Sequence, residues 1–351
     1  MKKKVYLTLE NGKVFQGYAF GADGEAVGEL VFTTNVVGYD KILTDPAYYG
    51  QIVVQTFPLI GNYGIIQSEL EGKKSFVAAY VVRECCDAPS NFRTEDTLDN
   101  YLKQQGIVGI YGVDTRELTR ILRTDGVMKA TISSKPVKDV SKMAAVEMSG
   151  AVAAVAPMQT VVYGEENTAG TVAFWDFGAQ ESAVQAWVDA GLKVIRMPAK
   201  STAAEILAMN VDGVIISEGP GDPKENVEAI EEMKKLIGKK PLFAVGLGMQ
   251  MLAIAQGGKV AKMKYGHRGG NQPVKYLPTG RVYVSSQNHG YEVLADSVAN
   301  AMVKFVNVND GGCEGFELEN ERVIVVQFAP TACSAALEAN FLMEQFVQML
   351  K

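Results

Sequence analysis

Histidine and cysteine are scarce in this sequence of 351 residues, which holds only two histidines and four cysteines. The cysteines form no CxxC pair and no zinc-finger spacing, and they are too few for a dense disulfide framework. They are Cys85, Cys86, Cys313 and Cys333. Histidine-based catalysis or metal binding is confined to His267 and His289. No metal site is therefore predicted.

Long apolar runs are also missing, since no uncharged stretch reaches the roughly 18 residues that a membrane helix needs. Met1 and the three lysines that follow it could open a signal peptide, but Val5–Glu10 alternates and carries a charge where an apolar core should continue. This stretch is better explained as a first strand. We expect a cytoplasmic protein, in a reducing compartment and without a membrane segment.

Acidic residues are absent between Glu232 and Glu292, whereas ten basic residues fall in this stretch. Its formal charge of +10 stands against −16 for the rest of the chain, which gives −6 overall. A net negative charge is not typical of general nucleic-acid binders, so no nucleic-acid partner is expected. The basic stretch is either a solvated face or a contact for an acidic partner or ligand.

Apolar residues make up 47% and charged residues 21% of the chain, which is typical of a soluble globular protein, and the length suggests about two domains. Residues 1–135 contain short β-type runs and helical patterns at 97–105 and 116–123, which predict an α+β domain. Residues 136–170 are first rich in Ala, Val and Ser and then polar. We interpret them as an interdomain connection, with a packed helix as the alternative for the Ala-rich part.

From residue 171 to the end at 351, strand-like and helix-like segments alternate. The expected strands are 171–175, 193–197, 213–217 and 241–245, and the expected helices are 181–190, 202–209, 226–237 and 249–255. Such alternation is typical of an α/β domain with a mostly parallel, doubly wound sheet. After His267 the chain returns to β-type segments at 281–285 and 323–327, and a last helix is expected at 335–350.

The turn after the strand at 241–245 reads Gly246-Leu247-Gly248 and leads into a helix. A dinucleotide-binding loop has this strand–turn–helix order, but Met251 replaces its third glycine and no acidic residue follows about 20 positions later. The alternative is a nucleophile elbow, a sharp turn that presents one side chain above the sheet beside backbone N–H groups. That motif needs Ser or Cys at its apex, whereas the apex here would be Gly246.

Motifs in both halves of the chain carry a resemblance to a known family. In the first half they are Val27–Phe32, Ile42–Pro46, Pro58–Asn62 and Asp114–Arg120. In the second half they are Asp176–Gly178, Ser217–Pro223, Met263–His267, Asn271–Val274 and Ser286–Gly290. With these motifs the chain resembles the small subunit of carbamoyl-phosphate synthetase nearly from end to end. The C-terminal half of that family is a class I glutamine amidotransferase domain.

The resemblance implies a catalytic triad whose three members are all replaced here. In the family the elbow reads Cys-Leu-Gly-His-Gln, and a thiolate activated by a His-Glu pair attacks the glutamine carboxamide. The nucleophile position corresponds to Gly246, the base to Ala329 and its orienting carboxylate to Thr331. Glycine suits the turn because the apex is strained for a residue with a Cβ atom. We therefore expect no glutaminase activity from the chain on its own.

The resemblance also maps the family's glutamine contacts onto this chain. They fall on Ala47, Gly219, Gly221, Leu247, Gln250, Asn288, Gly290 and Tyr291. Ala47 replaces a family serine, and Glu218, beside the set, replaces a usual asparagine. The other positions keep family-compatible residue types, although tight turns alone would also retain the glycines.

The histidines and the cysteines do not take the place of the missing groups. His289 corresponds to a residue of a glutamine-contacting loop in the family. His267 is expected in a loop, as a hydrogen-bonded structural residue. Cys313 and Cys333 do not lie on an elbow, so a structural role is expected for both.

Three hypotheses about function follow from the resemblance. In the first, the chain is the non-catalytic partner of a large synthetase subunit in arginine or pyrimidine biosynthesis. That subunit would use ATP, bicarbonate and free ammonia, and the chain itself would hold no cofactor. In the second, the chain is a free-standing regulatory pseudoenzyme that binds glutamine or another amino acid. In the third, Cys313 or Cys333 is the nucleophile of an active glutaminase.

Overall fold

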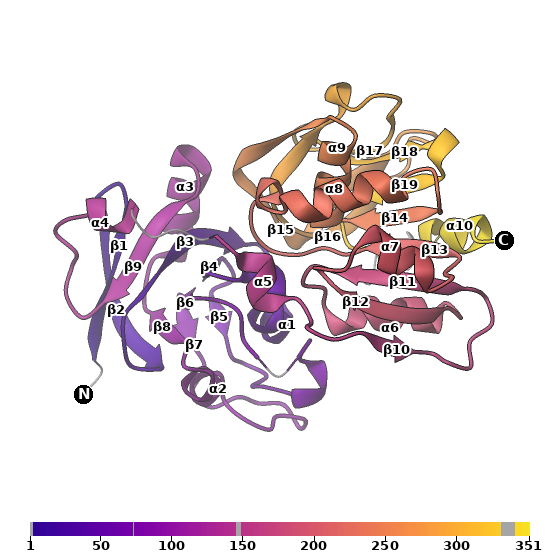
Figure 1. Ribbon diagram of the computed structural model, residues 1–351. Coiled ribbons are helices and arrows are strands. Elements are labelled where there is room, and N and C mark those ends of the chain that lie inside the picture. The colour runs from indigo at the N-terminus through magenta and orange to yellow at the C-terminus, as the bar shows by residue number, and fades with distance from the viewer. Residues whose placement is uncertain (1–2, 73, 145–148, 331–340) are drawn as a thin grey trace. The chain divides into compact units, whose positions relative to one another are not determined.

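The computed structural model describes residues 3–72, 74–144, 149–330 and 341–351 (Figure 1). The chain divides into two compact units, Met1–Met148 and Ser149–Lys351. The change between them falls inside the stretch 136–170. There α4 (Ser141–Ala144) precedes the change, and α5 (Ala151–Val155) and β10 (Val161–Tyr163) belong to the second unit.

The first unit is a closed barrel with the strand order β1-β2-β8-β6-β4-β3-β9. Its strands are β1 (Lys4–Leu9), β2 (Val14–Gly21), β3 (Ala26–Thr33), β4 (Gln51–Gln55), β6 (Ala79–Val82), β8 (Val108–Tyr111) and β9 (Met128–Ser133). Closure pairs every one of these strands on both sides, so the barrel has no open edge. A separate short pair joins β5 (Leu59–Ile60) to β7 (Glu84–Cys85).

Besides α4, the described helices of the first unit are α1 (Tyr39–Thr44), α2 (Leu98–Gln105) and α3 (Thr115–Asp125). Side-chain caps mark the starts of α2 and α3. The Thr97 hydroxyl accepts the N–H of Asn100 at the start of α2, and Gly106 ends that helix with φ 71°. The Asp114 carboxylate accepts the N–H of Glu117 at the start of α3. These caps confirm both helices that the sequence predicts in this unit.

The second unit is built on one sheet with the strand order β10-β12-β11-β13-β14-β19-β18-β16-β15-β17. Its strands after β10 are β11 (Thr171–Asp176), β12 (Lys193–Pro198), β13 (Gly213–Ile216), β14 (Leu242–Val245), β15 (Lys259–Tyr276), β16 (Val282–Leu294), β17 (Met302–Asn307), β18 (Cys313–Leu318) and β19 (Val323–Val326). The run from β12 to β19 is parallel, β10 is antiparallel at one edge, and β18 to β17 continue the other side as antiparallel strands.

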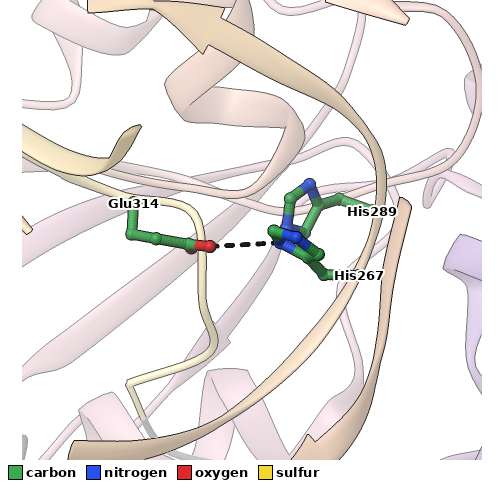
Figure 2. A group of neighbouring side chains, drawn as sticks. All are labelled: His267, His289 and Glu314. Carbon is green, nitrogen blue, oxygen red and sulfur yellow. Dashed lines mark ion pairs between the residues drawn. The ribbon is translucent and has the colours of Figure 1, made fainter. Parts of the chain in front are cut away.

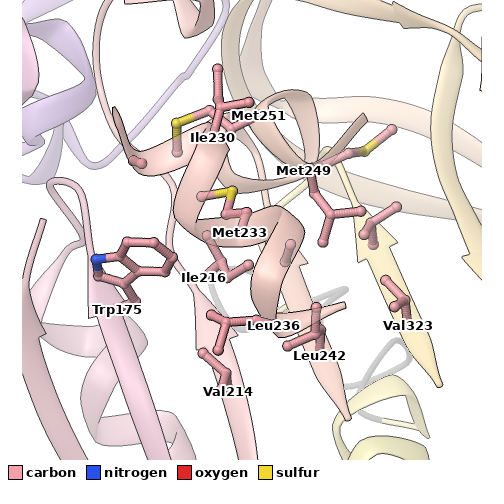
Figure 3. Close-up of a cluster of buried hydrophobic side chains, with 14 of the residues drawn as sticks. Trp175, Val214, Ile216, Ile230, Met233, Leu236, Leu242, Met249, Met251 and Val323 are labelled. Carbon is pink, nitrogen blue, oxygen red and sulfur yellow. The ribbon is translucent and has the colours of Figure 1, made fainter. Parts of the chain in front are cut away.

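Helices pack on both faces of the parallel strands, as a doubly wound fold requires. The helices are α6 (Glu181–Asp189), α7 (Ala203–Ala208), α8 (Val227–Leu236), α9 (Leu247–Ala255) and α10 (Phe341–Met349). One core joins α7, α8 and α9 to Val214 and Ile216 of β13, and Figure 3 shows the α8 side of it. The other core joins α6 and α10 to Ile215 and Phe243. Neighbouring residues of β13 serve opposite cores because successive side chains of a strand point to opposite faces.

The expected places of the two histidines in loops need correction. His267 lies in β15 rather than in a loop, and His289 lies in β16, so both belong to a long antiparallel hairpin. The predicted helix at 335–350 is described as α10 only from Phe341, because residues 331–340 lie outside the described ranges. Within the described ranges no helix is long and apolar enough to cross a membrane.

The order of the parallel strands reverses at β11, because β12 lies on one side of this strand and β13 on the other. In sheets of this kind, ligands bind outside the carboxyl ends of the strands near such a reversal. The carboxyl ends of β11, β13 and β14 lead into Phe177, Ser217 and Gly246. A ligand site is therefore expected at the residues that follow these three strands.

Candidate functional site

The turn between β14 and α9 is the centre of the candidate site. Gly246 is buried at the start of α9 with φ 53° and ψ −113°, outside the regions that residues with a Cβ atom favour. Its N–H donates to the carbonyl of Val326 at 2.9 Å, and its carbonyl accepts the N–H of Gln250 at 3.1 Å. The backbone therefore makes the sharp turn of an elbow, but glycine presents no side chain at its apex.

Two side chains flank the place that a side chain at position 246 would occupy. An ideal Cβ there would lie 3.1 Å from Cβ of Glu218 and 3.8 Å from Nε2 of Gln327. Gln327 is buried, and its Oε1 accepts a hydrogen bond from Gln250 Nε2 at 3.0 Å. Its Nε2 has no hydrogen-bond partner among the described residues. A buried amide donor thus lies beside the apex of the turn.

Ala329 follows β19 and is held by the neighbouring antiparallel strands. Its N–H donates to the carbonyl of Ser286 on β16 at 3.1 Å, in an isolated bridge between the two residues. The position to which the resemblance assigns the base thus ends in a methyl group that can neither accept nor donate a proton. Thr331, assigned to the orienting carboxylate, lies outside the described residues.

The structure brings several expected glutamine-contact positions of the second unit together. A Cβ atom on Gly219 would lie 2.5 Å from the Phe177 carbonyl oxygen and 2.9 Å from Cδ2 of Leu247. Close packing is therefore enough to require glycine there. Gln250, on α9, donates from Nε2 to the Tyr291 carbonyl at 3.1 Å. The Tyr291 hydroxyl in turn donates to Oδ2 of Asp222, next to Gly221, at 3.1 Å.

The remaining expected contacts lie on β16 and in the first unit. Asn288 and Gly290 lie on β16, the strand that also carries Tyr291. Ala47 belongs to the first unit, where its N–H donates to Oδ1 of Asp45 at 2.9 Å. A methyl group there cannot donate the hydrogen bond of the family's serine.

A buried ion pair holds the loop that follows β11. Asp176 is fully buried, and its Oδ1 accepts the N–H groups of Gly178 and Ala179 at 2.7 and 2.8 Å. Its Oδ2 accepts from Nε of Arg196 on β12 at 2.5 Å. The Ser217 hydroxyl accepts the N–H of Phe177 at 2.8 Å, which ties the loops after β11 and β13 to each other. Sequence reasoning quoted Asp176 as part of a motif but did not find this role.

Both histidines of the chain meet in one buried cluster, which sequence reasoning also missed. His267 and His289 are paired across β15 and β16, and their ring centroids are 5.0 Å apart (Figure 2). Burial lowers the pKa of His289 to about 4, so this ring is neutral at pH 7. Burial also disfavours charge on His267, but the carboxylates of Glu314 and Asp310 outweigh it and raise the pKa of the ring.

Cys313 does not have the properties of a nucleophile. It is buried on β18, and burial raises the pKa of its thiol to about 12. A thiol with so high a pKa is almost entirely protonated at pH 7, whereas the thiolate is the reactive form. The structural role expected for Cys313 agrees with this. Cys333 lies outside the described residues.

The basic stretch between Glu232 and Glu292 begins with two lysines that have acidic partners on the same helix. Lys234 pairs with Glu231 and Lys235 with Glu232, each at 2.5 Å. Such exposed pairs on one turn of a helix are typical of a solvated face. These two lysines therefore favour the interpretation of the basic stretch as a solvated face, rather than as a contact for an acidic partner or ligand.

Comparisons with known proteins agree with this architecture. Residues 7–132 match the family model described as "Carbamoyl-phosphate synthase small chain, CPSase domain", and residues 173–349 match "Glutamine amidotransferase class-I". The carbamoyl phosphate synthase small chain of Clostridium perfringens is 43% identical over 348 residues, which cover 98% of this chain and 99% of the relative. The chain belongs to the carbamoyl-phosphate synthase small chain family.

Other members of the family are similar over comparable lengths. The small chain of Fusobacterium nucleatum is 43% identical, with 97% of each chain covered. The pyrimidine-specific small chain of Bacillus subtilis is 41% identical, with 100% of this chain and 96% of the relative covered.

The conformation of Gly246 predicts the result of adding a single methyl group. We expect Gly246→Ala to lower the free energy of unfolding by about 1–3 kcal/mol, because a Cβ atom strains this backbone conformation. The new atom would also press against Glu218 at 3.1 Å. Thermal or urea unfolding measures the change. The matched control is Gly72→Ala, since no atom lies within 4 Å of a Cβ there. Equal stability of the two variants would contradict strain at the turn.

Proposed function

We propose that this chain is a carbamoyl-phosphate synthase small subunit without glutaminase activity, and that it serves as the non-catalytic partner of a large synthetase subunit. The large subunit would form carbamoyl phosphate from ATP, bicarbonate and free ammonia. ATP would bind to that subunit, so the proposal assigns no cofactor to this chain. The large subunit and this chain would form a heterodimer.

The observation that carries the proposal is the preserved elbow without a nucleophile. The turn at Gly246 keeps its backbone hydrogen bonds to Val326 and Gln250, although its apex has no side chain. Ala329 adds no group that could activate a nucleophile. Amide hydrolysis by this family's mechanism needs both a nucleophile and a base, because an unactivated group attacks too weakly. The fold is thus compatible with binding to a large subunit, but not with the hydrolysis of glutamine by this family's mechanism.

A second function is favoured by one specific feature, the buried amide of Gln327. Its Nε2 lies beside the apex and has no partner among the described residues. A buried donor without an acceptor is unfavourable by about 1–3 kcal/mol, and a ligand oxygen would relieve that penalty. Glutamine or another small amino acid has such oxygens. The alternative is therefore a regulatory pseudoenzyme that binds an amino acid without hydrolysing it.

Reconstitution with the large chain of the same organism tests the proposal. We expect the two chains to co-purify at micromolar concentration. The complex should form carbamoyl phosphate with ammonium chloride as nitrogen donor, and not with glutamine. Carbamoyl phosphate is measured after its conversion to citrulline by added ornithine carbamoyltransferase.

Two outcomes would overturn it. The absence of a complex at micromolar concentration would exclude the partner role, and calorimetry with glutamine on the chain alone would then test the pseudoenzyme alternative. Synthesis supported equally by glutamine and by ammonium chloride would exclude the loss of glutaminase activity. The Bacillus subtilis small chain, assayed with its own large chain, is the control for a glutamine-dependent reaction.

A further inference from the structure

Three side chains with metal-binding donor atoms meet beside the site. They are His267 on β15, His289 on β16 and Glu314 on β18 (Figure 2). One donor atom from each lies within 4.8 Å of the other two, and all three residues are buried. The proposed function uses none of these groups.

The neighbours of His289 determine which of its nitrogens can bind a ligand. Nδ1 lies 2.9 Å from the carbonyl of Tyr291, and because a carbonyl only accepts, Nδ1 carries the proton. Nε2 then has a lone pair, and it faces the acceptor oxygen of Gln287 at 3.0 Å. Two acceptors at this distance repel unless the amide turns to donate its N–H or a cation lies close by. This lone pair is the donor that His289 would offer to a metal ion.

His267 is oriented by a carboxylate, as metal-binding histidines commonly are. Its Nε2 lies 2.7 Å from Oδ2 of Asp310, which accepts the ring N–H. Its Nδ1 lies 3.2 Å from Oε1 of Glu314 and 3.3 Å from Nδ2 of Asn307, on the side of the cluster. The competing explanation is a protonated ring between two carboxylates, with no metal ion.

The Glu314 carboxylate is buried and only partly hydrogen-bonded. Only 1% of the residue is exposed, and Oε1 accepts a hydrogen bond from Asn307 Nδ2 at 2.9 Å. Its Oε2 is buried and has no hydrogen-bond partner among the described residues. A buried carboxylate oxygen without a partner is strongly unfavourable. A bound cation would supply the missing interaction.

We propose that His267, His289 and Glu314 bind one divalent transition-metal ion, of which Zn²⁺ is the representative. Two imidazole nitrogens and one carboxylate are a donor set that Zn²⁺ accepts, and they leave a fourth tetrahedral position. In a tetrahedral site, donors about 2 Å from one Zn²⁺ ion lie about 3.3 Å from each other. The three donor atoms now lie within 4.8 Å of one another, so the longest separation shortens by about 1.5 Å or less when the ion binds.

The location suggests what the ion does. It would join three neighbouring strands of the antiparallel half of the sheet. The Tyr291 carbonyl that orients His289 also accepts from Gln250, which bonds to Gln327 beside Gly246. The ion therefore fixes strands on which the candidate site depends, and its role is structural.

Cobalt substitution tests the site on the full chain. Metal-free protein is titrated with Co²⁺, whose visible spectrum reports tetrahedral nitrogen and oxygen ligands, and then with Zn²⁺, whose content is measured by elemental analysis. We expect one ion per chain. Glu314→Gln should lose the ion at equimolar metal while its far-ultraviolet circular dichroism stays unchanged. Asp310→Asn, which removes only the orienting carboxylate, should bind roughly 10- to 100-fold more weakly.

The matched control is Glu317→Gln, the same substitution on the same strand but at a carboxylate that pairs with Lys304 outside the cluster. This variant should bind Co²⁺ as the unchanged chain does. Absence of a Co²⁺ spectrum at equimolar metal would overturn the proposal and leave the protonated-ring explanation. A spectrum with thiolate charge-transfer absorption would place the ion on cysteine and would overturn it as well. So would equal binding by Glu314→Gln. None of these outcomes bears on the reconstitution with the large chain.

Discussion

The triple variant Gly246→Cys, Ala329→His and Thr331→Glu is expected to release ammonia from glutamine, whereas the unchanged chain releases none above background. The backbone turn that a nucleophile requires is already present at Gly246. What is missing is the reactive side chain and the pair that activates it. In a well-studied hydrolase, removal of a complete triad lowers kcat by roughly 10⁶, so its restoration is the largest change in activity that we expect. A coupled glutamate dehydrogenase assay measures the ammonia.

The partial variants separate the roles of the three positions. Gly246→Cys alone should stay inactive because its thiol has no base, and Ala329→His with Thr331→Glu should stay inactive because no nucleophile is present. Members of a triad act as a unit, so their effects are not additive. Ammonia release by the unchanged chain, abolished when Cys313 or Cys333 is alkylated, would contradict the prediction and support the third hypothesis. An inactive triple variant would show that the loss of the triad is not the only change at the candidate site, and Glu218→Asn would be added next.

The strand, turn and helix at 241–255 could be predicted from the sequence because local rules and the fold agree there. β14 lies between β13 and β19 in the sheet and is buried on both faces, so its sequence is continuously hydrophobic and predicts a strand. The glycine that follows permits the turn. The caps of α2 and α3 were predictable for the same reason, since Thr97 and Asp114 satisfy backbone groups within their own helices.

The histidine cluster could not be predicted because its members meet through strand pairing alone. His267 and His289 are 22 positions apart, and β15 shows register shifts between Lys262 and His267 and again between Gly269 and Gln272. These irregularities break the period-2 alternation by which a strand is recognised, so the segment resembles a loop. Glu314 comes from a third strand, and no spacing rule connects it to the hairpin. Residues that meet only in the folded sheet leave no local pattern.

Asp176→Ala is expected to lower the free energy of unfolding of the second unit by about 3–5 kcal/mol, the range found when one partner of a buried ion pair is removed. Asp176 is fully buried and accepts from Arg196, whose side chain is 11% exposed. Without the carboxylate, the guanidinium stays buried. Among the described residues, the exposed Glu181 is then its one acidic partner, at 2.6 Å. The N–H groups of Gly178 and Ala179 lose their acceptor too. Urea unfolding followed by tryptophan fluorescence measures the change, since Trp175 and Trp187 both lie in this unit.

Glu181→Ala is the matched control, because it removes the other carboxylate from the same guanidinium. The Glu181 side chain is 54% exposed, and ion pairs of such residues contribute about 1 kcal/mol or less. A large difference between the two variants would locate the stabilisation in the buried carboxylate and its hydrogen bonds. Similar losses would contradict this assignment and mean that Arg196 depends on both carboxylates equally.

The Asp176 loop lies at the carboxyl end of β11 and is bonded to Ser217. Its stability therefore also affects how rigid the backbone around Gly246 is. We therefore expect the triple variant to lose its restored activity when Asp176→Ala is added, and to keep most of it when Glu181→Ala is added.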